Sequence, residues 1–232
     1  MIEERANDVA TSTVENYLKQ LYLEQRQAEQ KMVPMGRLAE AMGVVPGTAT
    51  SMVKALADSG LVQYAPRGGV RLTASGEQLA LHVLRRHRLV ELFLVKILGM
   101  DWSVVHDEAD ELEHAISDRV LERMDHVLGH PTADPHGDPI PSDKGQIHDP
   151  RRMSLADCPV GVPVRIARVV DQGSEFLQFM EKQGLMPGAI VTAEDRQEAG
   201  ASVSLRVDGR KRVSLGLAAA AKILVEPTRK KS

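Results

Sequence analysis

The apolar residues in the first third of the chain recur at helical spacing and then change to the alternation of strands. Val14, Tyr17, Leu18 and Leu21 lie about one helical turn apart, so residues 10–25 are predicted to form an amphipathic helix. The pattern then predicts two short helices over 35–42 and 48–59, closed by Gly43 and Gly60, and two strands over 61–64 and 70–73.

Longer helical patterns fill the middle of the chain, and a β-rich pattern follows them. Residues 74–98 and 102–128 each place apolar residues on one face, which predicts two long helices. Residues 129–149 are rich in Pro, Gly, Asp and His without any period, as in a linker or extended loop. From residue 154 short apolar runs alternate with Gly and Asp, which predicts strands interrupted by one helix over 175–182.

Two short helices joined by a glycine-containing turn and followed by a hairpin are typical of a winged helix-turn-helix. In that motif the N-terminal residues of the second helix face base edges in the DNA major groove. The candidate DNA-binding residues are small hydroxyl side chains and a lysine on that helix, and an arginine at the hairpin tip: Thr48, Thr50, Ser51, Lys54 and Arg67. The alternative is an ordinary helical hairpin in which the Ser and Thr residues only cap the second helix.

Composition narrows the class of protein. Apolar residues make up 43% and charged residues 26% of the 232 residues, which is ordinary for a soluble globular chain. The single cysteine, Cys158, excludes a disulfide scaffold and a multi-cysteine zinc site. The longest apolar stretch, 89–100, contains charges and is too short to span a bilayer, and the acidic N-terminus is unlike a signal peptide. A cytoplasmic protein is expected.

The formal net charge is −3, but carboxylates and imidazoles gather in the middle of the chain. All eight histidines lie between His82 and His148. Two predicted helices carry potential ligands at helical spacing: His87 and Glu91, then His106, Asp110, Glu113 and His114. Carboxylate oxygens mixed with imidazoles, without a thiolate, suit Mn(II) or Fe(II).

The alternative interpretation of these residues is a solvated helix face with ion pairs between neighbouring turns. For four histidines without comparable partners in the pattern, a structural or surface role is the interpretation adopted: His126, His130, His136 and His148.

Taken together, these segments resemble the diphtheria-toxin-repressor family of metal-dependent transcriptional regulators, on its manganese-responsive branch. The segments that carry the resemblance are PGTATS (46–51), RRHRLVE (85–91), VHDEA (105–109), EHAISD (113–118) and DPHGDPIP (134–141). The resemblance covers residues 10–150, and less specifically a C-terminal region similar to the family's small SH3-like domain. It implies a homodimer that binds a double-stranded DNA operator when a divalent metal ion is bound.

The resemblance also implies two metal sites in each subunit. The ancillary site matches His87, Glu91 and His106, and the primary site matches Asp110, Glu113 and His114. In the family a residue of the first helix completes the primary site, which is Asn16 here, and the C-terminal domain caps the ancillary site, where Gln172 and also Asp171 align.

The resemblance to the family also indicates which metal ion is expected. Asp110 stands where iron-type members typically have Cys, and a hard carboxylate favours manganese. Mn(II) is therefore the expected cofactor, with Fe(II) as the alternative. Lys19 occupies a position at which the short manganese regulators have a carboxylate, so their binuclear arrangement is not expected.

The expected fold is mainly α with a C-terminal β-rich domain. We expect a winged helix-turn-helix DNA-binding domain over 1–73, a helical dimerisation and metal-binding domain with its linker over 74–150, and an SH3-like domain over 151–232.

Two rival functions remain open at this point. One is a di-metal carboxylate enzyme, because Glu113 belongs to a Glu-x-x-His beginning at Glu111. Such bundles use that motif twice, and no second copy is found, so no catalytic residue is predicted and a non-enzyme is expected. The other rival is a DNA-binding protein whose His and Glu residues are merely structural. Metal dependence of operator binding would separate the two DNA-binding interpretations.

Overall fold

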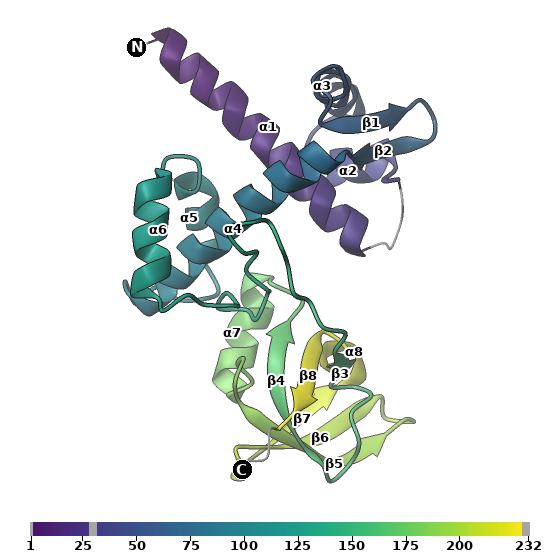
Figure 1. The fold of residues 1–232 in the computed structure, drawn as a ribbon. Helices are drawn as coiled ribbons and strands as arrows, with labels where there is room; N and C mark the ends of the chain where they lie inside the picture. The colour runs from purple at the N-terminus through teal and green to yellow at the C-terminus, as the bar shows by residue number, and fades with distance from the viewer. Residues whose placement is uncertain (1, 28–31, 229–232) are drawn as a thin grey trace. The chain divides into compact units, whose positions relative to one another are not determined.

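The structure, a computed structural model, describes the backbone of residues 2–27 and 32–228 (Figure 1). The chain forms two compact units. The first consists of Met1–His87 together with Pro141–Ile147, and the second of Arg88–Ile140 together with His148–Ser232. Their boundary falls inside one long helix, α4 (Ala74–Lys96). None of the described helices is long and apolar enough to cross a membrane.

The first unit has the predicted helix-turn-helix and wing. Its elements are α1 (Ile2–Gln27), α2 (Met35–Ala41), α3 (Pro46–Asp58), β1 (Val62–Ala65) and β2 (Gly69–Leu72), followed by the first part of α4. Pro46 lies in the first turn of α3, where the missing N–H costs no hydrogen bond. Gly43 and Gly60, just beyond α2 and α3, both have positive φ, which explains why these helices end there.

One hydrophobic core holds the first unit together. Leu18 and Leu21 of α1, Val53 of α3, and Val70 of β2 are at most 1% exposed. Ile147, from the segment that returns to this unit, packs against the same core. The core therefore combines residues that are far apart in the sequence.

The end of α1 also fixes both parts of the motif by polar contacts. The buried Glu24 carboxylate pairs with Arg37 of α2. Its hydrogen bond and charge raise the pKa of the Arg37 guanidinium. One residue further, the Gln25 side-chain carbonyl accepts the Leu72 backbone N–H at 3.0 Å. Helix α1 thus holds α2 on one side and the wing on the other.

In the second unit, the predicted single helix over 102–128 is wrong. Two helices form instead, α5 (Val105–Leu112) and α6 (Asp118–Val127), separated by a turn. Ser117 is extended, and its carbonyl accepts the Leu121 N–H as the first bond of α6. The break lets Ala109 of α5 pack in the cluster of Val90 and Leu94, while Leu121 packs with Leu89 and Leu92. Burial on two sides of α4 thus overrides a continuous helical pattern.

The C-terminal part of the second unit is one six-stranded sheet with two helices, so the expected fold class is confirmed. The strands are β3 (Met153–Ser154), β4 (Pro163–Val169), β5 (Ile190–Gln197), β6 (Ser202–Val207), β7 (Lys211–Gly216) and β8 (Ile223–Pro227), and the helices are α7 (Ser174–Gln183) and α8 (Leu217–Ala220). The strand order is β3-β8-β4-β5-β6-β7, with antiparallel neighbours. Val203, Leu205 and Val207 alternate into the core, as the period-2 pattern predicts.

The only cysteine lies inside this sheet core. Burial raises the pKa of the Cys158 thiol, and the side chain is inaccessible to solvent. Because the thiolate is the reactive form, we expect Cys158 of the native protein to react with a thiol reagent far more slowly than that of the urea-denatured protein. A time course with a chromogenic disulfide measures this. Equal rates in the two states would contradict the buried position.

Candidate metal centre

The loop over residues 133–140, here called the acidic loop, folds on the carboxylate of its own Asp134. Asp134 Oδ1 accepts the backbone N–H groups of His136 at 2.8 Å and Asp138 at 2.9 Å. This is how an Asp side chain stabilises a turn without a helix or strand. The two following polar side chains, His136 and Asp138, are thereby held in fixed positions, and both are buried.

The acidic loop lies directly against strand β4. The Val169 N–H donates to the His136 carbonyl at 2.8 Å. Gly137 has φ +88°, and a Cβ atom there would lie 2.0 Å from the Ala167 carbonyl oxygen. Only glycine combines that backbone conformation with such a close approach. The contact places the loop between the sheet and α4.

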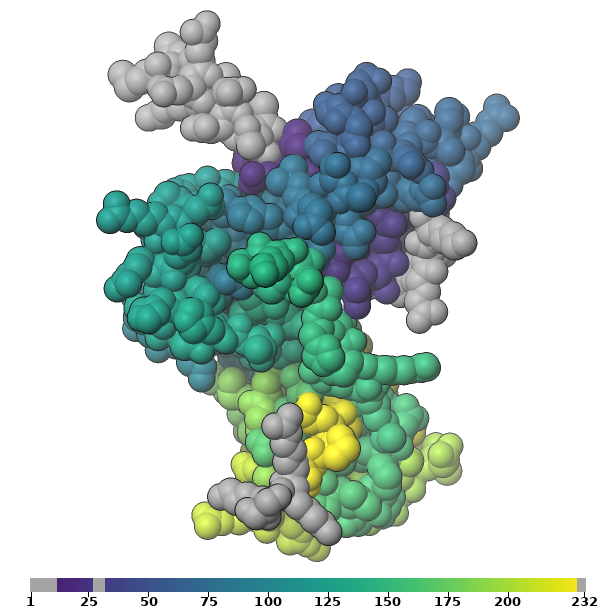
Figure 2. Space-filling view, in the orientation of Figure 1, coloured from purple at the N-terminus to yellow at the C-terminus, as the bar shows by residue number. Residues whose placement is uncertain are grey.

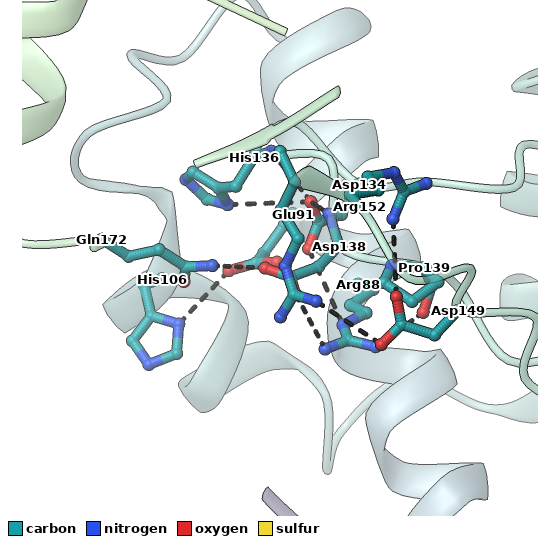
Figure 3. A network of polar contacts seen from close by, with 11 residues as sticks. Arg88, Glu91, His106, Asp134, His136, Asp138, Pro139, Asp149, Arg152 and Gln172 are labelled. Carbon is teal, nitrogen blue, oxygen red and sulfur yellow. Dashed lines mark hydrogen bonds and ion pairs between the residues drawn. The ribbon is translucent and has the colours of Figure 1, made fainter. Parts of the chain in front are cut away.

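Three potential metal ligands meet at this point, here called the Glu91 cluster: Glu91 of α4, Asp134 and His136 (Figure 3). One ligand atom of each lies within 4.8 Å of the others, and all three residues are buried. His106 of α5 joins the edge of the cluster, with Nδ1 3.2 Å from Glu91 Oε1. Residues from α4, α5 and the acidic loop therefore converge on one place.

His136 has a free ligand atom inside the protein. Its side chain is 1% exposed, and Nδ1 has no hydrogen-bond partner among the residues that the structure describes. A buried imidazole nitrogen without a partner is costly unless something binds it. Nδ1 lies 3.9 Å from Asp134 Oδ1. The pair can receive a cation between a nitrogen and an oxygen ligand.

Arginine side chains neutralise only part of the charge around the loop. Arg88 lies 3.7 Å from Asp134 and 3.4 Å from Asp138, and it donates to the Pro139 carbonyl at 2.6 Å. Arg168 of β4 pairs with Asp138 as well. Asp138 is thus matched by two guanidinium groups.

Asp134 is less well compensated. Burial raises its pKa well above the usual range, and the carboxylates of Asp138 and Glu91 raise it further, while Arg88 acts in the opposite direction. Asp134 shares the Arg88 guanidinium with Asp138. Such a site favours added positive charge, and its oxygen and imidazole donors are those that Mn(II) and Fe(II) accept. The residues present fit a divalent cation.

The predicted ligands His87 and Glu91 both lie on α4, one turn apart, and both are buried. Within the first unit, the Lys19 ammonium lies 3.4 Å from His87 Nδ1, and Lys19 is itself buried. The structure therefore puts a cationic side chain directly beside His87.

The other predicted ligands lie on α5 and in the turn after it. His106 Nε2 is 3.9 Å from Asp110, and both side chains are substantially exposed. Glu113 and His114 fall in the break between α5 and α6, with His114 Nε2 3.4 Å from a fully buried Glu113 carboxylate. Asn16 is half-buried on α1 in the first unit.

The two predicted contributors from the C-terminal domain behave differently. Gln172 reaches the acidic loop, where its amide donates to Asp138 Oδ2 at 2.6 Å (Figure 3). Asp171 instead accepts a 2.6 Å hydrogen bond from Lys222, which lowers the pKa of Asp171. Of the two, Gln172 is the one beside the Glu91 cluster. Its role as a metal ligand stays a prediction, like that of the helix-borne residues.

The sequence pattern shows no comparable partners for His136, but the structure places it beside Glu91 and Asp134 in the Glu91 cluster. Asp134 was not among the predicted ligands either. Helical spacing does not apply to an irregular loop, so it does not single out Asp134 or His136. The signal that was present is two carboxylates and an imidazole in the five-residue run DPHGD, 134–138.

The candidate DNA-binding residues lie on the surface of the first unit. Thr48, Ser51, Lys54 and Arg67 are exposed, and Thr50 is half-buried. The hydroxyl groups of Thr50 and Ser51 donate to carbonyls one turn back, at 2.7 and 3.0 Å, so they are satisfied without DNA. Helix α3 and the wing belong to the blue part of the surface in Figure 2, where the hairpin protrudes into solvent.

Three family profiles match successive parts of the chain. Residues 10–70 match the N-terminal DNA binding domain of iron dependent repressors, and residues 73–142 match their metal binding and dimerisation domain. Residues 153–227 match the FeoA domain. The division at residues 73 and 150 that we predicted remains a proposal, since the structure itself separates two units rather than three.

Individual relatives match over most of their length. The iron-dependent repressor IdeR of Mycobacterium tuberculosis is 33% identical over 219 residues, covering 88% of this chain and 92% of that protein. The diphtheria toxin repressor of Corynebacterium efficiens is 37% identical over 177 residues, covering 74% and 75%. A solved manganese-dependent transcriptional repressor in complex with manganese has 39% identity and a TM-score of 0.82, covering 92% of this chain and 99% of that one. The chain belongs to the iron-dependent repressor and diphtheria toxin repressor family and is a metal-dependent transcriptional repressor of that family.

Proposed function

We propose that this protein is a manganese-dependent repressor that acts in the cytoplasm as a homodimer on a double-stranded DNA operator. The observation that carries the metal dependence is the Glu91 cluster, with its buried carboxylates and with His136 Nδ1, which has no hydrogen-bond partner among the described residues. The manganese-bound relative supports Mn(II). The iron-dependent relatives keep Fe(II) as the second candidate. The DNA-binding family match favours this function over a di-metal carboxylate enzyme, and we propose no catalytic residue.

The proposed ligands form two groups. The first is His87, Glu91 and His106, extended by Asp134 and His136 of the acidic loop, with Gln172 at its edge. The second is Asp110, Glu113 and His114, completed by Asn16. Both groups combine carboxylate or carbonyl oxygens with imidazole nitrogens and contain no sulfur, which suits Mn(II) and Fe(II).

A bound divalent cation supplies the positive charge that the clustered carboxylates lack. Without it, Asp110 and Glu113 repel each other and the elements that carry them fluctuate. As a further ligand of the same ion, Asn16 would make the position of α1 depend on metal binding. Helix α1 also holds α2 through Glu24 and the wing through Gln25. Its position therefore sets that of the helix-turn-helix and wing (residues 35–72), here called the reading head.

Repression requires two reading heads at a fixed spacing. In a two-fold dimer the α3 helices must match half-sites about one helical turn, or about 34–36 Å, apart. The segment from the end of α4 to the end of α6 exposes several large apolar side chains that suit a dimer contact: Ile97, Leu98, Val104, Leu112, Val120 and Val127. On each half-site we propose that Thr48, Thr50 and Ser51 face base edges, and that Lys54 and Arg67 contact phosphates.

The test is a DNA-binding titration by fluorescence anisotropy, with promoter fragments of manganese- and iron-uptake genes. Each fragment is titrated with chelator, with Mn(II), and anaerobically with Fe(II). We expect binding only with metal, and abolished metal-stimulated binding in Glu113→Ala, because the buried carboxylate is lost from the site. Glu122→Ala removes an exposed carboxylate of α6 and should bind like the wild type.

Each outcome has a definite meaning. Equal binding in chelator and in metal contradicts the metal dependence. Stronger binding with Fe(II) than with Mn(II) selects the iron-dependent alternative. Undiminished Mn(II)-stimulated binding by Glu113→Ala removes that residue from the ligand set.

A further inference from the structure

Trp102 holds His136 from two directions. The residue lies between α4 and α5 and is 2% exposed. Its backbone carbonyl is 2.9 Å from His136 Nε2. Its indole ring stacks on the imidazole, with ring centroids 5.5 Å apart and an interplanar angle of 23°. The carbonyl and the ring together leave the imidazole little freedom to turn.

The contact between His136 Nε2 and the Trp102 carbonyl decides which nitrogen of the imidazole carries the proton. A carbonyl oxygen only accepts hydrogen bonds, so Nε2 must donate and must carry the hydrogen. In the neutral ring Nδ1 then keeps its lone pair. That is the atom without a hydrogen-bond partner among the described residues, and it lies 3.9 Å from Asp134 Oδ1. Histidine ligands in proteins are commonly fixed in this way, by a hydrogen bond from the nitrogen that does not bind the metal.

We infer that Trp102 is the positioning residue of the Glu91 cluster: it fixes His136 in the Nε2-protonated form and presents Nδ1 as the metal-ligating atom. The inference rests on the proposed function only in requiring that a cation binds at this cluster. Trp102 is also the only tryptophan of the chain, so its fluorescence reports on this place alone.

The first test needs no metal. Nitrogen NMR of the full-length, histidine-labelled, metal-free protein distinguishes the two neutral forms of each imidazole. His136, identified by the signal missing from His136→Ala, is expected in the Nε2-protonated form. An Nδ1-protonated His136 would overturn the inference, whatever the protein does with metals.

The second test measures Mn(II) affinity by calorimetry. Trp102→Leu keeps an apolar side chain but removes the ring, and it is expected to weaken binding roughly tenfold, as loss of outer partners of metal ligands typically does. Trp102→Phe restores a stacking ring and should bind close to the wild type. Leu185→Ala opens a cavity in the core that also contains Trp102, and it controls for lost stability.

Fluorescence gives an independent readout. Mn(II) should change the Trp102 emission of the wild-type protein but not that of His136→Ala, which keeps the tryptophan. If Trp102→Leu folds and binds Mn(II) as tightly as the wild type, or if Leu185→Ala loses as much affinity, Trp102 has no positioning role. If Trp102→Leu fails to fold, the protonation state of His136 decides. A wild-type protein that does not bind Mn(II) at all contradicts the proposed metal, while the NMR result still tests the role of Trp102.

Discussion

Replacing Arg88 by methionine is expected to lower the free energy of unfolding of the metal-free second unit by about 3 kcal/mol. The side chain is only 8% exposed, pairs with Asp134 and Asp138, and donates to the Pro139 carbonyl. Its loss removes a guanidinium group from the buried Asp134 and Asp138 and a hydrogen-bond donor from the Pro139 carbonyl. Urea unfolding followed by Trp102 fluorescence measures the change, and saturating Mn(II) should recover part of it.

The matched control is Arg212→Met in the sheet. Arg212 also pairs with a carboxylate, that of Glu194 at 3.0 Å, but its side chain is 75% exposed. An exposed pair contributes about 0–1 kcal/mol, so this variant should be almost as stable as the wild type. If the two variants lose the same stability, burial of the acidic loop does not govern the energetics of these ion pairs.

Gly137→Ala is expected to destabilise the second unit by about 4 kcal/mol, adding the strain of a positive φ to that of overpacking. The new Cβ would lie 2.0 Å from the Ala167 carbonyl oxygen and 2.7 Å from the Arg168 Cα, both backbone atoms that cannot turn aside. The acidic loop must then move off β4 and carry His136 with it. Thermal unfolding and Mn(II) calorimetry should show lower stability and weaker metal binding together.

Gly209→Ala separates strain from overpacking. Gly209 has φ +70°, similar to Gly137, but a Cβ atom added there would meet no heavy atom within 4 Å. This variant should lose about 1 kcal/mol and keep its Mn(II) affinity. Equal losses in the two glycine variants would mean that the close approach to β4 contributes nothing.

The DNA-binding motif could be predicted from sequence because its signals are local. Pro46 and Gly60 mark the two ends of α3, and the hairpin alternates over only a few residues. The break at Ser117 could not be predicted from sequence, because residues 105–128 continue the helical period across it. What ends α5 is packing against two sides of α4, and a contact between distant segments has no local signal.

The residues of the candidate site also divide into those that could be predicted from sequence and those that could not. Helix-borne candidates such as His87 and Glu91 stand out by their spacing. His136 and Asp134 lie in a loop, where the spacing of residues along the sequence does not indicate in which direction their side chains point. Their positions depend on the turn that Asp134 makes with the backbone, on Gly137 against β4 and on the carbonyl of Trp102. None of these contacts leaves a period in the sequence.

The discontinuous first unit has a consequence for the order in which the protein is made. Its core includes Ile147, which residues 88–140 separate from the N-terminal part of that unit, Met1–His87. During synthesis the reading head can therefore begin to fold early, but its core is completed only after the helices α5 and α6 and the acidic loop have left the ribosome. The nascent DNA-binding unit cannot finish folding ahead of the segment that carries the Glu91 cluster.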